Sequence, residues 1–174
     1  MKWLSLLGLS AWIATVFVLL KVVEVTKLRS FDPNQRLYLQ SISTDFEKKI
    51  TELLHKNTGD LTKTAIHFRS GKCVCEALVG SHSDELATNL AAANFHNVTV
   101  KLDDLPGIGA YIPSTPAVAI FNESQQLIYL GPYAIGLGCF TDDSLINTIL
   151  RYTRANYWGA QINSDVEGCY CTTQ

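Results

Sequence analysis

The chain has 174 residues, of which 47% are hydrophobic, and its formal net charge at pH 7 is −2. This length suits one globular domain with an appendage. Because the chain contains no basic run or stripe, we do not expect nucleic acid as a partner.

The first segment, residues 3–20, is apolar and carries no charged side chain. As a helix it would measure roughly 27 Å, close to the hydrocarbon thickness of a bilayer. A secretory signal peptide is the alternative, but the apolar run is long for one and no small-residue cleavage motif follows it. We therefore predict a transmembrane anchor over 1–22, with a linker over 23–35 and the following domain on the extracytoplasmic side.

Helices and strands are then expected to alternate. Apolar residues at spacings of three and four predict a helix over about 35–56. The β-branched run Thr62–Phe68 predicts a strand, a second helix is expected from Cys73 to about Phe95, and Val98–Leu102 alternates like a strand. Glycine and proline mark a loop over 106–116.

The second half of the chain predicts a hairpin and a last helix. Ala117–Phe121 is wholly apolar, as in a buried central strand, and Leu127–Tyr133 would return beside it. Thr141–Asp143 would cap the final helix. This order predicts an α/β fold, a mixed sheet with helices on both faces, formed by a domain over 36–158. The tail, 159–174, shows no periodicity.

Five cysteines follow the apolar segment. Behind an anchor they indicate an oxidising compartment, and their odd number leaves at least one thiol free, bound to metal or engaged in exchange. They form two C-x-C pairs and a single cysteine: Cys73 with Cys75, Cys169 with Cys171, and Cys139.

The C-x-C spacing disfavours a bond within a pair. Side chains at i and i+2 diverge on a helix, and in an extended segment their Cα atoms lie near the upper limit for a disulfide. A Cys73–Cys75 bond would therefore be strained and easily reduced, unless each cysteine has another partner.

Cys73 lies where a predicted strand passes into a predicted helix, and Ser-Thr-Pro (114–116) directly precedes the apolar strand. With the order of elements, these features resemble the thioredoxin-like superfamily over about 36–157. The whole chain resembles membrane-anchored bacterial thioredoxin-fold proteins of an uncharacterised family. The resemblance implies a cis Thr115–Pro116 bond beside Cys73. The span 103–115 is too short for the usual third helix, and C-x-C replaces the usual C-x-x-C.

The resemblance also implies roles. Cys73 would be the nucleophile, its thiolate stabilised by a helix N-terminus and by Lys72. Cys75 would resolve the mixed disulfide, and Thr115 and Pro116 would shape a substrate groove. His67 would transfer a proton where the family often carries a buried carboxylate; a strand histidine bonded to backbone is the alternative.

The family topology brings the loop that ends in Cys139 to the same pole as the first C-x-C pair. We therefore expect Cys139 to join the redox cycle through a bridge to Cys73 or Cys75. A bridge between the two C-x-C pairs is the competing arrangement. Cys169 and Cys171 are also candidates for an auxiliary disulfide.

Three functions fit these observations. The first is a thiol–disulfide oxidoreductase anchored in a bacterial inner membrane by residues 3–20, with a periplasmic domain that acts on protein thiols or disulfides and needs no cofactor. The second is a thiolate module for zinc or copper. The third is a non-catalytic thioredoxin-like binding domain with structural bridges.

Overall fold

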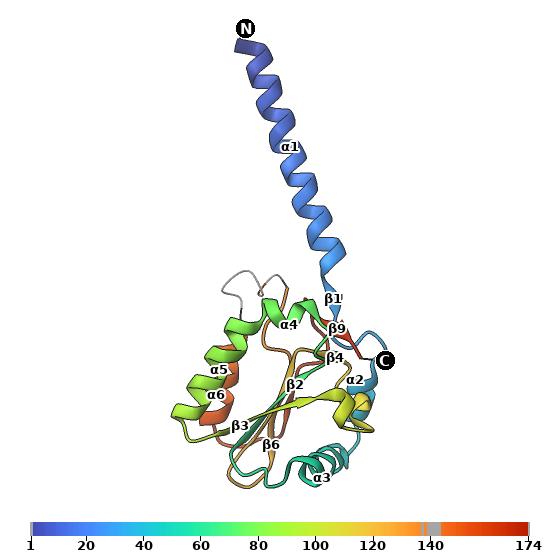
Figure 1. Ribbon diagram of the computed structural model, residues 1–174, viewed down its shortest axis with the longest axis vertical. Helices are drawn as coiled ribbons and strands as arrows, with labels where there is room; N and C mark the ends of the chain where they lie inside the picture. Colours follow the sequence, from blue (N-terminus) through green and yellow to red (C-terminus); the bar gives the residue numbers. More distant parts are fainter. Residues whose placement is uncertain (1, 137, 139–143, 174) are drawn as a thin grey trace.

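The computed structural model describes residues 2–136, 138 and 144–173. A mixed five-stranded sheet forms the centre of the molecule, and Figure 1 shows it between the surrounding helices. The strand order is β3-β2-β5-β6-β7. The outer pairs, β2 with β3 and β6 with β7, are parallel, and the inner pairs are antiparallel. The strands are β2 (Thr64–Arg69), β3 (His96–Lys101), β5 (Ala117–Phe121), β6 (Leu127–Gly131) and β7 (Gln161–Ile162).

Helices cover both faces of this sheet (Figure 1). One face carries α2 (Arg36–Ser41) and α3 (Phe46–Thr58), and the other carries α5 (Gly80–Ala92) and α6 (Ile146–Arg154). Short helical turns complete the connections: α4 (Val74–Leu78), η1 (Leu102–Asp104) and η2 (Ile108–Ala110).

Side-chain alternation along the strands explains the two cores. Successive strand residues point to opposite faces. Thus Ile66 and Phe68 of β2 pack with Phe46 of α3, whereas Ala65 packs in the cluster that contains Leu86 of α5. The predicted mixed α/β sheet with helices on both faces is confirmed.

Both long predicted helices are interrupted. The first breaks between α2 and α3, where the Ser43 hydroxyl bonds the Asp45 carboxylate and the Ser43 amide donates to the Gln40 carbonyl. Short polar side chains offer such alternatives to helical bonding. The second helix breaks at Val79, directly before Gly80. The predicted cap Thr141–Asp143 lies outside the described residues.

The tail adds short strands that sequence periodicity did not predict. β8 (Glu167–Gly168) pairs with β1 (Arg29–Ser30), and β9 (Cys171–Thr172) pairs with β4 (Ser114–Thr115), both antiparallel. Two-residue strands are too short to show an alternating pattern. These two ladders bring the C-terminal tail to the end of the sheet where β5 begins.

The N-terminal helix α1 (Lys2–Lys27) extends away from the sheet (Figure 1). Large apolar side chains along it are exposed, among them Trp3, Trp12 and Phe17. Within the described residues, no helix has both the length and the hydropathy that crossing a membrane requires. The predicted transmembrane anchor is therefore not confirmed.

Candidate functional site

The loop between β2 and α4 delivers Cys73 to the end of the sheet. Gly71 adopts a left-handed conformation, φ 74°, which glycine reaches without steric cost. The Glu76 carboxylate accepts hydrogen bonds from the backbone amides of Ser70 (2.5 Å) and Gly71 (3.1 Å). Cys73 thereby becomes the N-cap residue of α4, in extended conformation. Because α4 has five residues, the helix that begins beside Cys73 is much shorter than the sequence predicted.

Two disulfides join the first C-x-C pair to the second. Cys73 bonds Cys171, with their Cα atoms 5.8 Å apart, and Cys75 bonds Cys169, with theirs 5.5 Å apart. Both separations lie in the usual range for disulfides. The competing arrangement of the sequence analysis is the one the structure contains.

Two expected bridges are corrected by this connectivity. Neither Cys73 nor Cys75 bonds Cys139, and Cys169 does not bond Cys171, because each C-x-C cysteine has its partner in the opposite pair. The physical reason is the one that disfavours Cys73–Cys75: i,i+2 neighbours reach a facing segment more easily than each other. Cys139 itself lies outside the described residues, so its part in a redox cycle stays a prediction.

The Thr115–Pro116 bond is cis and lies beside Cys73, as predicted. The Cys73 sulfur is 3.8 Å from the Thr115 carbonyl oxygen. A disulfide sulfur has no proton to donate, so this is a contact rather than a hydrogen bond while Cys73 is oxidised. β4 ends at Thr115, directly before this proline, and the register of its ladder places Thr115 opposite Cys171.

Each disulfide combines one buried and one partly exposed cysteine. Cys73 and Cys169 are 8% and 7% exposed, whereas Cys75 and Cys171 are half-buried. An external thiolate therefore reaches the residues Cys75 and Cys171 more easily. The sulfur atoms of Cys73, Cys75 and Cys171 all lie within 4.8 Å of one another. A thiolate released from one disulfide would therefore lie close to a sulfur atom of the other.

His67 is held in a buried network of β2 and its neighbours. Asn97 Nδ2 donates to the Ala87 carbonyl, so its Oδ1 accepts from His67 Nε2 at 2.9 Å. His67 Nδ1 then accepts from the Tyr133 hydroxyl at 2.6 Å. Both ring nitrogens of the neutral imidazole are thus satisfied. Among the described residues, the hydrogen bonds of His67 include none with a cysteine. This arrangement favours a structural role for His67 over proton transfer.

Burial lowers the pKa of His67 below its ordinary value of 6.5, although its hydrogen bond with Asn97 acts in the opposite direction. The unfolded chain therefore binds a proton near pH 6.5 that the folded chain binds only at lower pH. The contribution of neutral His67 to stability is full above pH 6.5. It is lost as the pH falls from there through the folded pKa, with a slope of at most about 1.4 kcal/mol per pH unit.

We expect His67→Gln to flatten this part of the pH profile. Urea unfolding between roughly pH 5 and 7.5 would measure it, because the histidine titrates in this window. His55→Gln, at an exposed position of α3, is the control and should keep the wild-type slope. Equal slopes for wild type and His67→Gln would contradict the assignment.

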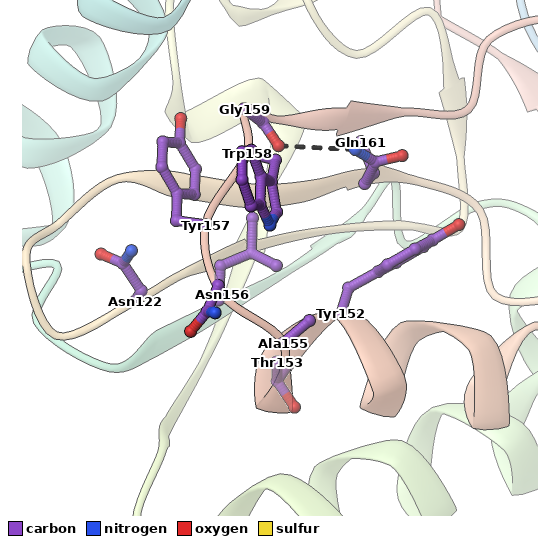
Figure 2. Close-up of a pocket in the computed structure, with 10 residues that line it drawn as sticks. Asn122, Tyr152, Thr153, Ala155, Asn156, Tyr157, Trp158, Gly159 and Gln161 are labelled. Atoms are coloured by element: carbon purple, nitrogen blue, oxygen red, sulfur yellow. Dashed lines mark hydrogen bonds between the residues drawn. The ribbon is translucent and has the colours of Figure 1, made fainter.

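A separate pocket of about 320 Å³ lies at the other end of β5 (Figure 2). Tyr152, Tyr157 and Trp158 surround it, and Gln161 Nε2 donates to the Gly159 carbonyl beside it. Asn122, which also lines it, follows the end of β5, whereas Pro116 precedes its start. The pocket is thus about 20 Å along the strand from Pro116 and is not part of the disulfide site.

A protein-family model matches this chain. The model described as Domain of unknown function (DUF6436) matches residues 42–173, more than half of the chain. The chain belongs to the DUF6436 family. Its DUF6436 region contains both C-x-C pairs and β9, so the cysteine-containing tail is part of the family domain. No curated protein and no solved structure matches the chain.

Sequence reasoning ranked the bonding between the two C-x-C pairs second, and it missed two other parts of the site. The equal C-x-C spacing of the two pairs was the available signal for their mutual bonding. The Glu76 clamp on the loop and the β4–β9 ladder left no signal, because single carboxylates and two-residue strands have no distinctive pattern.

Proposed function

We propose that this protein exchanges thiols and disulfides with other proteins through Cys73 and Cys171, on a thioredoxin-like fold. The observation that carries the proposal is the Cys73–Cys171 disulfide beside the cis Thr115–Pro116 bond. The strand-to-helix position of Cys73 and the β3-β2-β5-β6 order of the mixed sheet support the fold assignment.

The exchange reaction needs only these two cysteines and the client, and its bonds, protons and electrons are all accounted for. In the reduced protein, the Cys73 thiolate attacks one sulfur of a client disulfide, forms a mixed disulfide and releases a client thiolate, which takes a proton. The Cys171 thiol, after losing its proton, attacks Cys73 and releases the second client thiol. Two electrons pass to the client as the Cys73–Cys171 bond forms, and the reverse sequence oxidises a client dithiol.

The two members of each C-x-C pair have different roles in this proposal. Cys171, rather than the expected Cys75 or Cys139, resolves the mixed disulfide because it is the bonded partner of Cys73. Cys75 and Cys169 form a second bond between the same two segments and take no part in the transfer. Thr115 and Pro116 border the cysteine that meets the client.

Exchange with a cystine-containing model peptide tests the proposal. We expect Cys73→Ser and Cys171→Ser to reduce multiple-turnover exchange to the level of the uncatalysed reaction. The double variant Cys75→Ser/Cys169→Ser is the matched control, because it removes the neighbouring disulfide and should keep turnover. Turnover lost in the control but retained in Cys171→Ser would move the function to the other disulfide.

A second candidate function rests on the sulfur cluster. After reduction, Cys73, Cys75 and Cys171 would present three thiolates from one small region, with Cys169 as a fourth. Such a set suits zinc or cuprous copper. We expect the reduced protein, kept free of oxygen, to bind one Zn²⁺, and Cys75→Ser/Cys169→Ser to weaken binding strongly. A reduced protein that fails to bind Zn²⁺ in competition with a weak chelator would exclude this function for zinc.

Attachment to a membrane through residues 3–20, with a periplasmic domain, is also a proposal. The exposed apolar side chains of α1 support it. Carbonate extraction of cell membranes separates an attached chain from a released one.

A further inference from the structure

The end of the tail lies on β4 as an added strand. Ser114 pairs with Thr172 and Thr115 with Cys171, in a two-stranded ladder separate from the central sheet. Without β9, the backbone groups of β4 that face it would lose their partners. An unpaired strand edge of this kind is a template for another extended chain.

The chain beyond Tyr170 is held mostly by backbone bonds. The Thr173 amide donates to the Pro113 carbonyl at 2.8 Å, and its hydroxyl donates to the Ile112 carbonyl at 2.7 Å. Arg36 Nη2 donates to the Thr173 carbonyl at 3.0 Å. Most of these contacts do not depend on the identity of the tail side chains, so another extended segment could form them.

Tyr170 separates the fixed and the releasable parts of the tail. It is 5% exposed, packs edge-on against Phe31 and donates a hydrogen bond to the Ala134 carbonyl at 2.6 Å. Cys169, which directly precedes Tyr170, is also fixed, by its disulfide with Cys75. Cleavage of Cys73–Cys171 alone would therefore free residues 171–173 while the preceding segment stays in place.

Two side-chain hydroxyls of β4 are buried without a hydrogen-bond partner in the described part of the chain. Among the described residues, the hydroxyls of Ser114 and Thr115 are fully buried and make no hydrogen bond. A buried hydroxyl without a partner is unfavourable in free energy, so a segment whose polar group reached either hydroxyl would recover that cost.

We propose that residues 171–173 occupy the binding site of the client, an extended protein segment that carries a disulfide-bonded cysteine. The segment pairs with β4 in the antiparallel register of β9 and presents its cysteine to Cys73. This inference rests on the exchange function proposed above. The tail thus closes the site in the oxidised state and acts as an internal copy of the client.

Opening the site requires an external dithiol. One of its thiolates attacks the half-buried Cys171, forms a mixed disulfide on the tail and releases the Cys73 thiolate. The second thiol of the reductant, after losing its proton, attacks this mixed disulfide. The reductant becomes a disulfide, Cys171 becomes a thiol, and two electrons have entered the protein.

Hydrogen exchange in the full chain tests the release of the tail. In Cys171→Ser, the amides of β4 and of Thr173 should exchange at least about tenfold faster than in wild type, because local opening requires no disulfide cleavage. The control Cys75→Ser/Cys169→Ser keeps the Cys73–Cys171 bond, so these amides should exchange as slowly as in wild type. The amides of β5 should remain protected in both variants. Unchanged exchange in Cys171→Ser, or equal loss of protection in β5, would overturn the inference.

A peptide tests what takes the place of the tail. The probe is Tyr-Cys-Thr-Thr, whose cysteine is bonded to thionitrobenzoate, so attack by the Cys73 thiolate of Cys171→Ser releases a coloured thiol. Tyr-Cys-Thr-Pro is the control, because its proline cannot donate to the Pro113 carbonyl. We expect the first peptide to react about 2–10 times faster, as the loss of one or two hydrogen bonds implies.

The two proposals fail differently. Equal rates for the two peptides would overturn docking on β4 and leave exchange at Cys73 intact. No reaction with either peptide above that of Cys73→Ser/Cys171→Ser, which lacks both thiols of this pair, would overturn the exchange function and the inference with it.

Discussion

Removal of both disulfides is expected to lower the free energy of unfolding by about 7 kcal/mol, whereas removal of either one should cost about 2 kcal/mol. The first bond between the pairs closes a loop of 98 or 94 residues. On the chain-entropy model, such a loop stabilises the folded state by almost 5 kcal/mol. The second bond then closes a ring of about six residues and adds about 2 kcal/mol.

Urea unfolding of three variants measures this difference. Cys73→Ser/Cys171→Ser and Cys75→Ser/Cys169→Ser each retain one disulfide, and the quadruple variant retains neither. Cys139→Ser in every background prevents exchange with the fifth cysteine. A quadruple loss no greater than the sum of the two double losses would contradict the nested connectivity.

Tyr170→Ala is expected to lower the free energy of unfolding by about 3–5 kcal/mol, as for other buried aromatic residues. The substitution removes the edge-on contact with Phe31 and leaves the Ala134 carbonyl without this donor. The Cys73–Cys171 bond should also re-form more slowly after reduction, because Tyr170 fixes the tail between its two cysteines.

Two variants sharpen this prediction. Tyr170→Phe keeps the ring and should cost about 1 kcal/mol for the lost hydrogen bond. Tyr38→Ala removes a tyrosine that is 50% exposed and should change stability little. Chemical denaturation of all three gives the comparison, and a Tyr170→Ala loss as small as that of Tyr38→Ala would contradict a core role for the tail.

The parts of the fold with strong patterns could be predicted from the sequence. The apolar run Ala117–Phe121 is a central strand, as its local pattern predicted. Pro116 before it is cis, as the resemblance to the thioredoxin-like superfamily implied. Helix breaks at Ser43 and Val79 were harder to predict, since the residues around them still keep helical spacing.

The arrangement of the site depended on long-range contacts. Strained i,i+2 geometry correctly argued against a Cys73–Cys75 bond, but the partner of each cysteine depends on where the tail lies. That position is set by Tyr170 in the core and by two-residue ladders, which carry no periodic signal. His67 was singled out as a candidate for proton transfer, but its network with Asn97 and Tyr133 could not be foreseen because it joins residues far apart in the sequence.

Mass-spectrometric mapping of a trapped mixed disulfide tests the exchange function most directly. In Cys171→Ser, the Cys75–Cys169 bond leaves Cys73 and Cys139 as the free thiols. After reaction with a cystine-containing peptide, the peptide should be bonded to Cys73, because the resolving cysteine is absent. A peptide found on Cys139 instead, with Cys73 unmodified, would contradict the assignment of Cys73 as the exchanging cysteine.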